Sequence, residues 1–282
     1  MSDRDTDAAD AFDVLSDASR VAILRELADR THVVDESTVE FSDLRRAVGF
    51  DDAGRFNYHL GKLQDQFVVK RDGGYAPTAV GLKAIGSIES GTYTADLEPR
   101  PGTVDYDCPA CGDQLAATYE NQVVTVECEN GDDVFVETSV PPATAAGSTI
   151  QDIVSFVVGD LQRDVEAVAD GVCPICSGSM ELEHFERADD GHLRARSECL
   201  SCWMAAELPV GALVVRHPAV VSLYYDHGVD VRRQFLTDLE FVGARGDAEF
   251  VADDQSVVEL TVGVEGDEVT LRVHEDFTVE TT

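Results

Sequence analysis

The segment from Phe41 to Gly81 constrains the fold of this chain most, because its hydrophobic periodicity changes from that of helices to that of strands. The periodicity predicts a short helix, a turn and a second helix that opens at Asp51 or Asp52. Either aspartate suits an N-cap, where its charge stabilises the positive end of the helix dipole. One side of the second helix is apolar and is expected to be buried; it carries Phe56, Leu60, Leu63 and Phe67.

The other side of this second helix is polar. Burial of the apolar side turns outward four residues at helical spacing, with Asn57 beside them: Arg55, Tyr58, His59 and Lys62. A helix surface of this kind fits the major groove of DNA, which admits an α-helix and presents hydrogen-bonding base edges.

A tight β-hairpin is expected directly after this helix. Phe67–Lys70 has a strand pattern, Asp72–Gly74 forms a turn in which glycine permits positive φ, and Tyr75–Pro77 is the return strand. Lys70 and Arg71 lie near the turn. The order of helix, turn, helix and hairpin predicts a winged helix-turn-helix.

Two helices predicted at Asp7–Leu15 and Asp17–Ala28, and one at Ala79–Ile88, complete this domain. The run LSDASRVAILRELAD, followed by DDAGRFNYHL and the GGY of the hairpin, resembles the arsenic-repressor-like (ArsR-like) winged-helix transcriptional regulators. The segment is similar to the branch common in halophilic archaea, in which cysteine-bearing modules follow the winged helix. The resemblance covers roughly the first third of the chain.

The resemblance implies homodimeric, sequence-specific binding of double-stranded DNA that regulates transcription. It maps the recognition positions onto Arg55, Asn57, Tyr58, His59 and Lys62, and the hairpin adds two basic residues to the predicted contact set, Lys70 and Arg71. The chain departs from the metal-sensing members of that family. No cysteine precedes Cys108, so metal sensing within the winged helix is not supported.

Other interpretations of these residues stay open. Many winged helices bind proteins instead of DNA, and Tyr58 and His59 can instead pack on the neighbouring helix. Arg45 and Arg46 are expected in solvent, with phosphate contact as the less favoured alternative.

The net charge of −34, from 55 acidic and 21 basic residues, is extreme for a DNA-binding protein. Residues 41–83 nevertheless carry seven basic and five acidic residues, so the predicted DNA surface is the least acidic part. Only three basic residues are lysine, which with abundant Asp, Glu, Ala and Val resembles proteins adapted to molar salt. At about 1 M salt the Debye length is about 3 Å, so self-repulsion is screened.

The chain is expected to be cytoplasmic. It has no run of 18 apolar residues, and its N-terminus, MSDRDTDAAD, is acidic, so neither a membrane span nor a signal peptide is predicted. Its cysteines occur mostly as CxxC pairs, which in an intracellular chain favours metal thiolates over disulfides.

A second module begins after a predicted linker at Glu98–Gly102. Cys108 and Cys111 form a zinc-knuckle sequence, and three strands are predicted, at Leu115–Tyr119, Val123–Cys128 and Val134–Val140. Cys128 supplies a third ligand, but Gly131 stands where a fourth would be, with Asp132 and Asp133 beside it. We therefore interpret this module as a zinc ribbon with a degenerate and more often metal-free site.

A helix capped by Ser148 is predicted over Thr149–Ala169. Its apolar face is expected to pack between modules, with a dimerisation seam as the alternative. That face carries Ile150, Ile153, Val154, Val157, Leu161, Val165 and Val168.

The second cysteine set is complete and predicts a structural Zn²⁺ site. Two CxxC pairs, formed by Cys173, Cys176, Cys199 and Cys202, flank two strand patterns at Ser179–Phe185 and Leu193–Glu198. A hairpin between the pairs brings the four sulfurs together as a tetrahedral site with no open position. Such an ion supplies folding energy and does not catalyse a reaction. His184 and His192 are surplus to these ligands and are expected on the surface.

The sequence after Cys202 predicts a helix over Val210–Tyr225 that is divided or kinked at Pro218. A short helix over Asp230–Phe241 and a final antiparallel hairpin or small sheet are expected to follow. That sheet would contain strands at Val257–Val264 and Val269–His274. Several aromatic residues either belong to the core, which is favoured, or line a small pocket: Trp203, Tyr224, Tyr225, His227 and Phe235.

The sequence therefore predicts an α+β protein of four parts: a winged helix-turn-helix at 1–97, a degenerate zinc-ribbon-like module at 103–142, a linking helix at 148–170 and a four-cysteine zinc-ribbon module with helices and a β-hairpin at 171–282. A DNA-binding regulator is the favoured function. The alternative is a protein-interaction component of the archaeal transcription machinery that resembles transcription factor E. An enzyme is not expected, because no nucleophile with a neighbouring base, phosphate-binding loop or open metal site is apparent.

Overall fold

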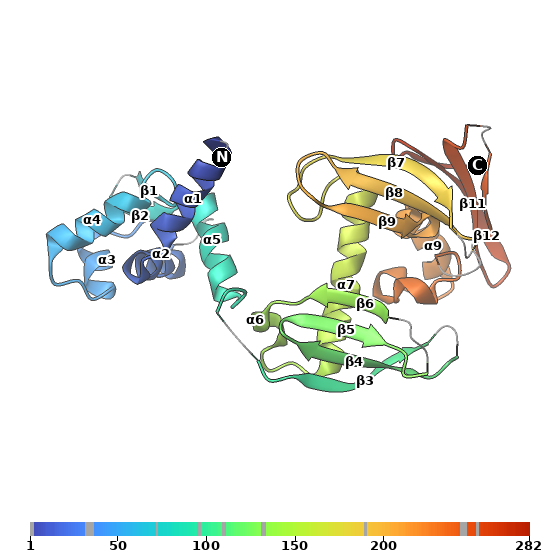
Figure 1. The fold of residues 1–282 in the computed structure, drawn as a ribbon, viewed down its shortest axis with the longest axis horizontal. Coiled ribbons are helices and arrows are strands. Elements are labelled where there is room, and N and C mark those ends of the chain that lie inside the picture. The colour runs from blue at the N-terminus through green and yellow to red at the C-terminus, as the bar shows by residue number, and fades with distance from the viewer. Residues whose placement is uncertain are drawn as a thin grey trace. The chain divides into compact units, whose positions relative to one another are not determined.

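The computed structural model describes residues 3–31, 37–71, 73–94, 97–108, 111–130, 134–188, 191–242, 247–251 and 254–282 (Figure 1). Contacts divide the chain into two compact units: Met1–Leu97 with Pro141–Ala146, here the N-terminal unit, and Glu98–Val140 with Gly147–Thr282, here the C-terminal unit. The fold is α+β, and the named strands form small sheets in which every pairing is antiparallel. Among the described residues, no helix has the length and apolar character that crossing a bilayer requires.

The N-terminal unit is a group of helices with one β-hairpin. Its elements are α1 (Asp3–Leu15), α2 (Ala18–Arg30), α3 (Phe41–Ala47), α4 (Ala53–Leu63), β1 (Val68–Arg71), β2 (Gly74–Pro77), α5 (Ala79–Glu89) and the short α6 (Pro142–Ala145). Asp17 caps α2 by accepting the Ser19 N–H at 2.8 Å, and Thr78 caps α5 by accepting the Gly81 N–H at 3.0 Å. The core of the unit consists of residues from α2 to α5, including Ile23, Leu24, Leu27, Leu44, Phe56, Leu60 and Leu63.

The C-terminal unit begins with a four-stranded sheet in the order β3-β4-β5-β6. Its strands are β3 (Arg100–Asp107), β4 (Gln114–Glu120), β5 (Val123–Glu127) and β6 (Val134–Ser139). The prediction of a linker through Gly102 was wrong, because Arg100, Pro101 and Gly102 are paired with β4. An edge strand tolerates proline, and a Cβ on Gly102 would lie only 2.8 Å from Ile150 Cγ2, so glycine permits the close approach of the next helix.

Helix α7 (Ile150–Ala169) packs against β3, β4 and β5 and, further along, against α8 (Val210–Val214). The prediction that it packs between modules is confirmed, and in Figure 1 it runs between the β3–β6 sheet and the β7–β9 sheet. Its N-cap is Thr149 and not the predicted Ser148. Thr149 Oγ1 accepts the Asp152 N–H while the Asp152 carboxylate accepts the Thr149 N–H, which forms a capping box.

A three-stranded sheet and two short helices follow α7. They are β7 (Met180–Arg187), β8 (Leu193–Cys199), β9 (Ala205–Pro209), α8 and α9 (Pro218–Asp226). Pro218 is the first residue of α9, so the predicted division of the helix at this proline is confirmed. Strand β9 was not predicted, although it pairs with β8 from Pro209 to Ala205.

The predicted helix over Asp230–Phe241 was wrong. The segment forms two 3₁₀ turns, Val231–Arg233 and Leu236–Asp238, with extended backbone between them. The side chain of Gln162 on α7 donates to the carbonyl oxygens of Val231 and Gln234, both at 2.7 Å. These tertiary hydrogen bonds occupy carbonyl groups that an α-helix would use internally.

The chain ends in a four-stranded antiparallel sheet, β10-β11-β12-β13, which confirms the predicted small sheet. Its strands are β10 (Asp247–Phe250), β11 (Val257–Val264), β12 (Asp267–His274) and β13 (Val279–Thr281). Val258, Leu260, Leu271 and Val273 are fully buried and belong to the same core cluster as Cys173 and Val168. This sheet, the β7–β9 sheet and the end of α7 therefore share one core.

Candidate functional site

The exposed face of α4 is the first candidate site. The Asp52 carboxylate accepts the Arg55 N–H at 2.6 Å and so caps the helix. The predicted apolar stripe is confirmed as buried, with Phe56, Leu60, Leu63 and Phe67 all at most 3% exposed. On the opposite side, the predicted polar residues other than His59 are exposed: Arg55, Asn57, Tyr58 and Lys62.

His59 is the exception, and the prediction that it faces outward was wrong. Its side chain is buried, with Nδ1 3.6 Å from the Asp17 carboxylate at the start of α2. The helical period explains this position, because residue 59 lies three after Phe56 and four before Leu63, within the buried stripe. The ring also lies 5.6 Å from that of Phe50 between ring centroids, so His59 joins α4 to its neighbours.

The exposed basic residues of α4 are held over aromatic rings. Arg55 Cζ lies 5.8 Å from the centre of the Phe50 ring, and Lys62 Nζ lies 5.9 Å from the centre of the Tyr58 ring. These separations are within the range of cation–π attraction, which restricts the motion of the long side chains. The α4 face therefore presents two oriented cations and an amide.

The β1–β2 hairpin lies after α4 in the same unit, and the predicted pairing of its strands is confirmed. Lys70 and Arg71 are exposed on β1, and Lys70 Nζ lies 5.7 Å from the centre of the Tyr75 ring. Gly73 has a φ of +92° in the turn, as expected, whereas Asp72 lies outside the described residues. A Cβ on Gly74 would lie 2.5 Å from the Val39 carbonyl oxygen, so glycine lets the hairpin pair with the segment before α3.

The two arginines of α3 differ from each other. Arg46 is exposed and pairs with Asp43 at 3.1 Å, as expected for a solvated side chain. Arg45 donates from one guanidinium nitrogen to the carbonyl oxygens of Phe50 at 2.9 Å and Asp51 at 2.7 Å. Arg45 therefore stabilises the turn between α3 and α4, a role that sequence spacing did not indicate.

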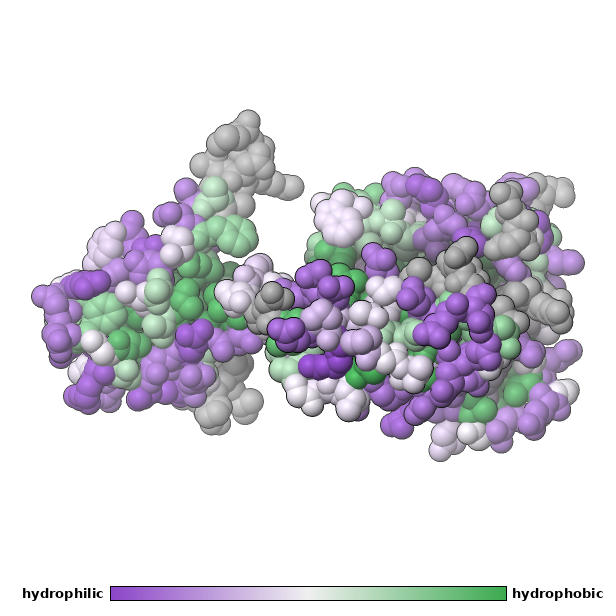
Figure 2. All heavy atoms as spheres, turned by 60° about the horizontal axis from the view of Figure 1, so that its bottom comes forward, coloured by the Kyte–Doolittle hydropathy of each residue, from purple (hydrophilic) through white to green (hydrophobic). Residues whose placement is uncertain are grey.

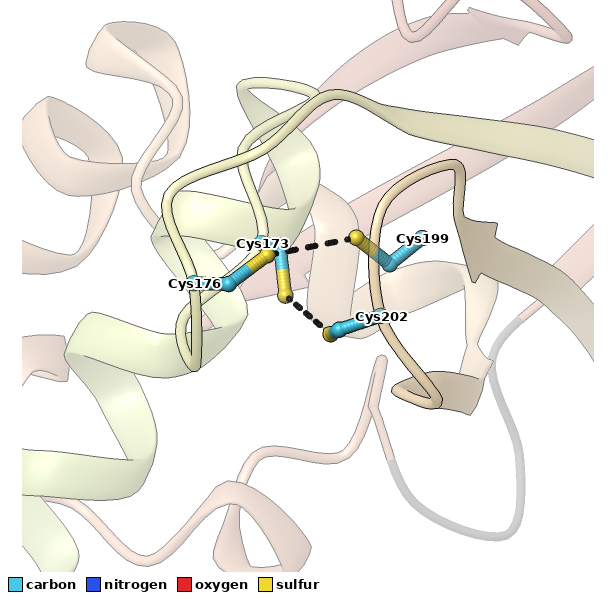
Figure 3. Close-up of side chains that lie close together, drawn as sticks. All are labelled: Cys173, Cys176, Cys199 and Cys202. Carbon is cyan, nitrogen blue, oxygen red and sulfur yellow. Dashed lines mark hydrogen bonds between the residues drawn. The ribbon is translucent and has the colours of Figure 1, made fainter. Parts of the chain in front are cut away.

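The second candidate site is the four-cysteine cluster, formed by Cys173, Cys176, Cys199 and Cys202, whose sulfur atoms all lie within 4.8 Å of one another (Figure 3). Sγ of Cys173 lies 3.7 Å from that of Cys202, and Sγ of Cys176 lies 3.5 Å from that of Cys199. A tetrahedral ion with metal–sulfur bonds of about 2.3 Å separates its sulfurs by about 3.8 Å. The four thiols could therefore hold a metal ion, as the spacing predicted.

Two backbone N–H groups point at sulfur atoms of this cluster. Gly178 N–H donates to Cys176 Sγ at 3.4 Å, and Ser201 N–H donates to Cys199 Sγ at 3.3 Å. The hydrogen bond from Ser201 lowers the pKa of the Cys199 thiol to about 7, since it stabilises the thiolate. Metal ligation requires the thiolate form, which N–H donors to sulfur stabilise.

A second group of potential metal ligands consists of Cys108, Cys111 and Cys128, whose sulfur atoms also lie within 4.8 Å of one another. Sγ of Cys111 is 3.6 Å from Sγ of Cys128. The side chain of Asn130 donates to the Asp113 carboxylate at 2.5 Å and so ties the loop after Cys128 to the Cys111 turn. The predicted place of a fourth ligand, residues 131–133, lies outside the described residues.

The aromatic residues that sequence reasoning grouped around Trp203 do not form one pocket. Tyr224 and Phe235 are buried in the core, whereas Trp203 and Tyr225 are 81% and 69% exposed. His227 caps α9 and hydrogen-bonds to Glu265 and Asp267. The favoured core interpretation thus holds for Tyr224 and Phe235 only.

Two family models match separate parts of the chain. Residues 8–88 match a family described as Domain of unknown function (DUF7347), and residues 105–279 match one described as Domain of unknown function (DUF7351). No curated protein and no solved structure matches the chain. Since the second match covers more than half of its length, the chain belongs to the family described as Domain of unknown function (DUF7351).

Proposed function

We propose that this protein is a DNA-binding transcriptional regulator that acts in the cytoplasm, with α2, α3, α4 and the β1–β2 hairpin as an ArsR-like winged helix-turn-helix. One observation carries the proposal. The face of α4 opposite the buried stripe exposes Arg55, Asn57, Tyr58 and Lys62, and none of these side chains is needed for the core. Arginine, lysine and asparagine are the side chains that most often contact guanine and adenine in the major groove.

The hairpin supplies the second part of the proposed interface. Lys70 and Arg71 project from β1 at its turn, where they would contact phosphate groups beside the groove that α4 occupies. His59 has a different role in this proposal. It positions α4 through Asp17 and does not contact DNA.

The proposed interface is tested with the double variant Arg55→Ala/Lys62→Ala in the full chain. We expect the loss of specific operator binding in molar KCl, measured by fluorescence anisotropy on a site obtained by chromatin immunoprecipitation. The matched control is Arg163→Ala/Arg233→Ala, which removes the same charge from exposed positions of the C-terminal unit. Unchanged binding in the first variant would refute the recognition role of α4.

Immunoprecipitation also separates the regulator from a component of the general transcription machinery. Discrete palindromic peaks are expected for a gene-specific regulator. Occupancy at every promoter, together with polymerase association that survives Arg55→Ala/Lys62→Ala, would favour the machinery component and contradict our proposal.

We propose that the regulator is a homodimer that pairs through an apolar groove of the N-terminal unit. The groove, of about 570 Å³, lies between α1 and α5 and exposes Phe12, Val80 and Tyr93. None of the described residues that line it is acidic. The chain has a net charge of −34, so two copies that meet at this surface avoid repulsion between carboxylates. Exposed apolar grooves commonly mark protein interfaces.

Light scattering in molar KCl tests the dimer. Phe12→Asp places a carboxylate in the groove and should give monomers, whereas Tyr225→Asp on the C-terminal unit should leave the dimer intact. A dimer that persists in Phe12→Asp would show that the pairing surface lies elsewhere.

The metal of the four-cysteine cluster is proposed to be Zn²⁺ in a structural role. Four thiolates fill a tetrahedral shell and leave no position for a substrate. Cys173 is fully buried in the core that the C-terminal sheet shares, so the ion would stabilise that core directly. Metal analysis of the purified chain should find zinc, and Cys199→Ser should lower its content and the stability of the C-terminal unit.

A further inference from the structure

The turn that carries Cys108 and Cys111 has the same backbone hydrogen bonds as the first turn of the four-cysteine cluster. Gly112 N–H donates to the Cys108 carbonyl at 2.8 Å, and Ser177 N–H donates to the Cys173 carbonyl at 2.9 Å. In each turn the N–H of the first cysteine donates to the carbonyl oxygen five residues ahead. Cys108 N–H donates to the Asp113 carbonyl at 2.7 Å, and Cys173 N–H donates to the Gly178 carbonyl at 2.8 Å. At its described residues, 108 and 111–113, the first turn therefore matches the first turn of the four-cysteine cluster.

Both turns also use a positive φ at the residue that follows the second cysteine. Gly112 has a φ of +76° and Ser177 a φ of +57°. This conformation turns the backbone back so that both sulfurs of the pair face one point. Glycine adopts this conformation without strain.

The third cysteine meets this turn from β5. Cys128 follows the strand directly and is 5% exposed, while Cys108 is 3% exposed and Cys111 is exposed. The 3.6 Å between Sγ of Cys111 and Cys128 is close to the spacing within the four-cysteine cluster, 3.5 and 3.7 Å. The three thiols therefore lie close enough together to bind one metal ion.

A fourth thiolate is not available to this group from the same chain. The sequence has seven cysteines, and the other four form the second cluster. Among the described residues, no carboxylate or imidazole lies within 4.8 Å of all three sulfurs. The Asp113 carboxylate interacts with the Asn130 side chain and with the Cys111 thiol, but it does not lie within 4.8 Å of all three sulfurs.

We propose that Cys108, Cys111 and Cys128 bind a second zinc-class divalent ion whose fourth coordination position is filled by an exchangeable external ligand. Three thiolates select a thiophilic ion, and three protein ligands with one open position is the arrangement of zinc sites that exchange ligands. The site differs from the four-cysteine cluster in its number of protein thiolates, and Cys111 makes it accessible from the surface. The proposal is independent of DNA binding.

The experiment uses the full chain in molar KCl, with its metal removed and replaced by Co²⁺. Absorption from sulfur-to-cobalt charge transfer reports the thiolates on each ion, and the weaker d–d bands report changes in its ligands. We expect two Co²⁺ per chain and a shift of the d–d bands on addition of imidazole. Cys111→Ser should retain one Co²⁺ and lose the imidazole response.

The origin of the fourth ligand is tested with Asp113→Ala and with Asp132→Ala/Asp133→Ala. Both variants should keep two Co²⁺ and the imidazole response. One Co²⁺ per wild-type chain would overturn the second site. Two Co²⁺ per wild-type chain without an imidazole response would overturn the open coordination position. An imidazole response seen only in the aspartate variants would show that a carboxylate is the fourth ligand, and it would overturn the open position as well.

A measurement on the wild-type chain covers the case in which Cys111→Ser fails to fold. Zn²⁺ should slow the alkylation of Cys111 by iodoacetamide by at least about tenfold, because a ligated thiolate is a poor nucleophile. Peptide mass spectrometry measures the rate of alkylation. A metal chelator should restore alkylation at Cys111 before it does so at Cys176, which is also exposed. Equal alkylation of Cys111 with and without Zn²⁺ would contradict the site.

Discussion

His227 links two distant parts of the C-terminal unit through a single side chain. It ends α9, and its Nδ1 lies 3.2 Å from the Glu265 carboxylate and its Nε2 2.9 Å from the Asp267 carboxylate. Hydrogen bonds to Glu265 and then to Asp267 raise the pKa of the imidazole. The protonated ring therefore fastens α9 to the β11–β12 turn.

The raised pKa of His227 predicts a pH dependence of stability. Protonation is favoured in the folded state, so the stabilisation is complete below the unfolded pKa of about 6.5 and disappears as pH rises through the higher folded pKa. In molar KCl, the melting temperature should fall more between about pH 6 and pH 8.5 in the wild type than in His227→Gln.

A histidine at the surface provides the control for this prediction. His184 is 48% exposed and lies 3.6 Å from Glu186, so His184→Gln should keep the pH dependence of the wild type. If the melting temperatures of His227→Gln and the wild type fall by the same amount over this pH range, His227 does not join α9 to the β11–β12 turn in solution.

Helix α5 shows how one small residue sets the packing of an element. A Cβ on Gly81 would meet the backbone carbonyl oxygen of Phe67 and, at 3.2 Å, Leu24 Cδ1 of α2. The same carbonyl accepts the Thr78 N–H at 2.9 Å, which joins the hairpin region to the start of α5. Gly86, one and a half turns later in the same helix, has nothing within 4 Å of its Cβ position.

These two glycines form a matched pair for a stability measurement. Gly81→Ala should destabilise the N-terminal unit by about 1–3 kcal/mol, because the backbone of Phe67 must move. Gly86→Ala should stabilise it by about 0.5–1 kcal/mol through helix propensity. Urea unfolding in molar KCl followed by circular dichroism checks both, and equal effects of the two changes would contradict the packing of α5.

At the scale of the whole molecule, charge decides the conditions in which the chain folds. The 55 acidic residues outnumber the 21 basic ones, and hydrophilic residues cover much of the face of each unit that Figure 2 shows. Apart from His59 with Asp17, every ion pair among the described residues has at least one exposed side chain, and exposed pairs contribute little. Screening by salt is therefore the main factor that weakens repulsion among the excess carboxylates.

Dilution of salt should unfold the protein. The Debye length grows from about 3 Å at 1 M to about 10 Å at 0.1 M, which restores repulsion between neighbouring carboxylates. Far-UV circular dichroism should show cooperative loss of structure as KCl falls, and sucrose of equal osmolality should not prevent it. A spectrum that stays native at 0.1 M KCl would contradict this expectation.

DNA binding should have a shallow dependence on salt. Lys70 and Arg71 of two protomers would neutralise about four phosphates, which corresponds to a slope of log K against log salt of about −4. An anisotropy titration in KCl measures the slope. A value near −8 or steeper would mean that the contact surface extends well beyond α4 and the hairpin.

Patterns that act over a few residues were predictable from the sequence. The helical period identified the buried stripe of α4, and the spacing of Cys173, Cys176, Cys199 and Cys202 identified their cluster. Both depend on local geometry, because a helix repeats every 3.6 residues and a CxxC turn brings its own two sulfurs together.

Only the tertiary structure decided which of several locally allowed arrangements each remaining segment adopts. Residues 100–102 form a strand because β4 pairs with them, and residues 230–241 form 3₁₀ turns beside Gln162. The physical reason is the same in each case. The deciding contacts join residues far apart in the chain, and their free energy exceeds the small local preferences that a sequence pattern expresses.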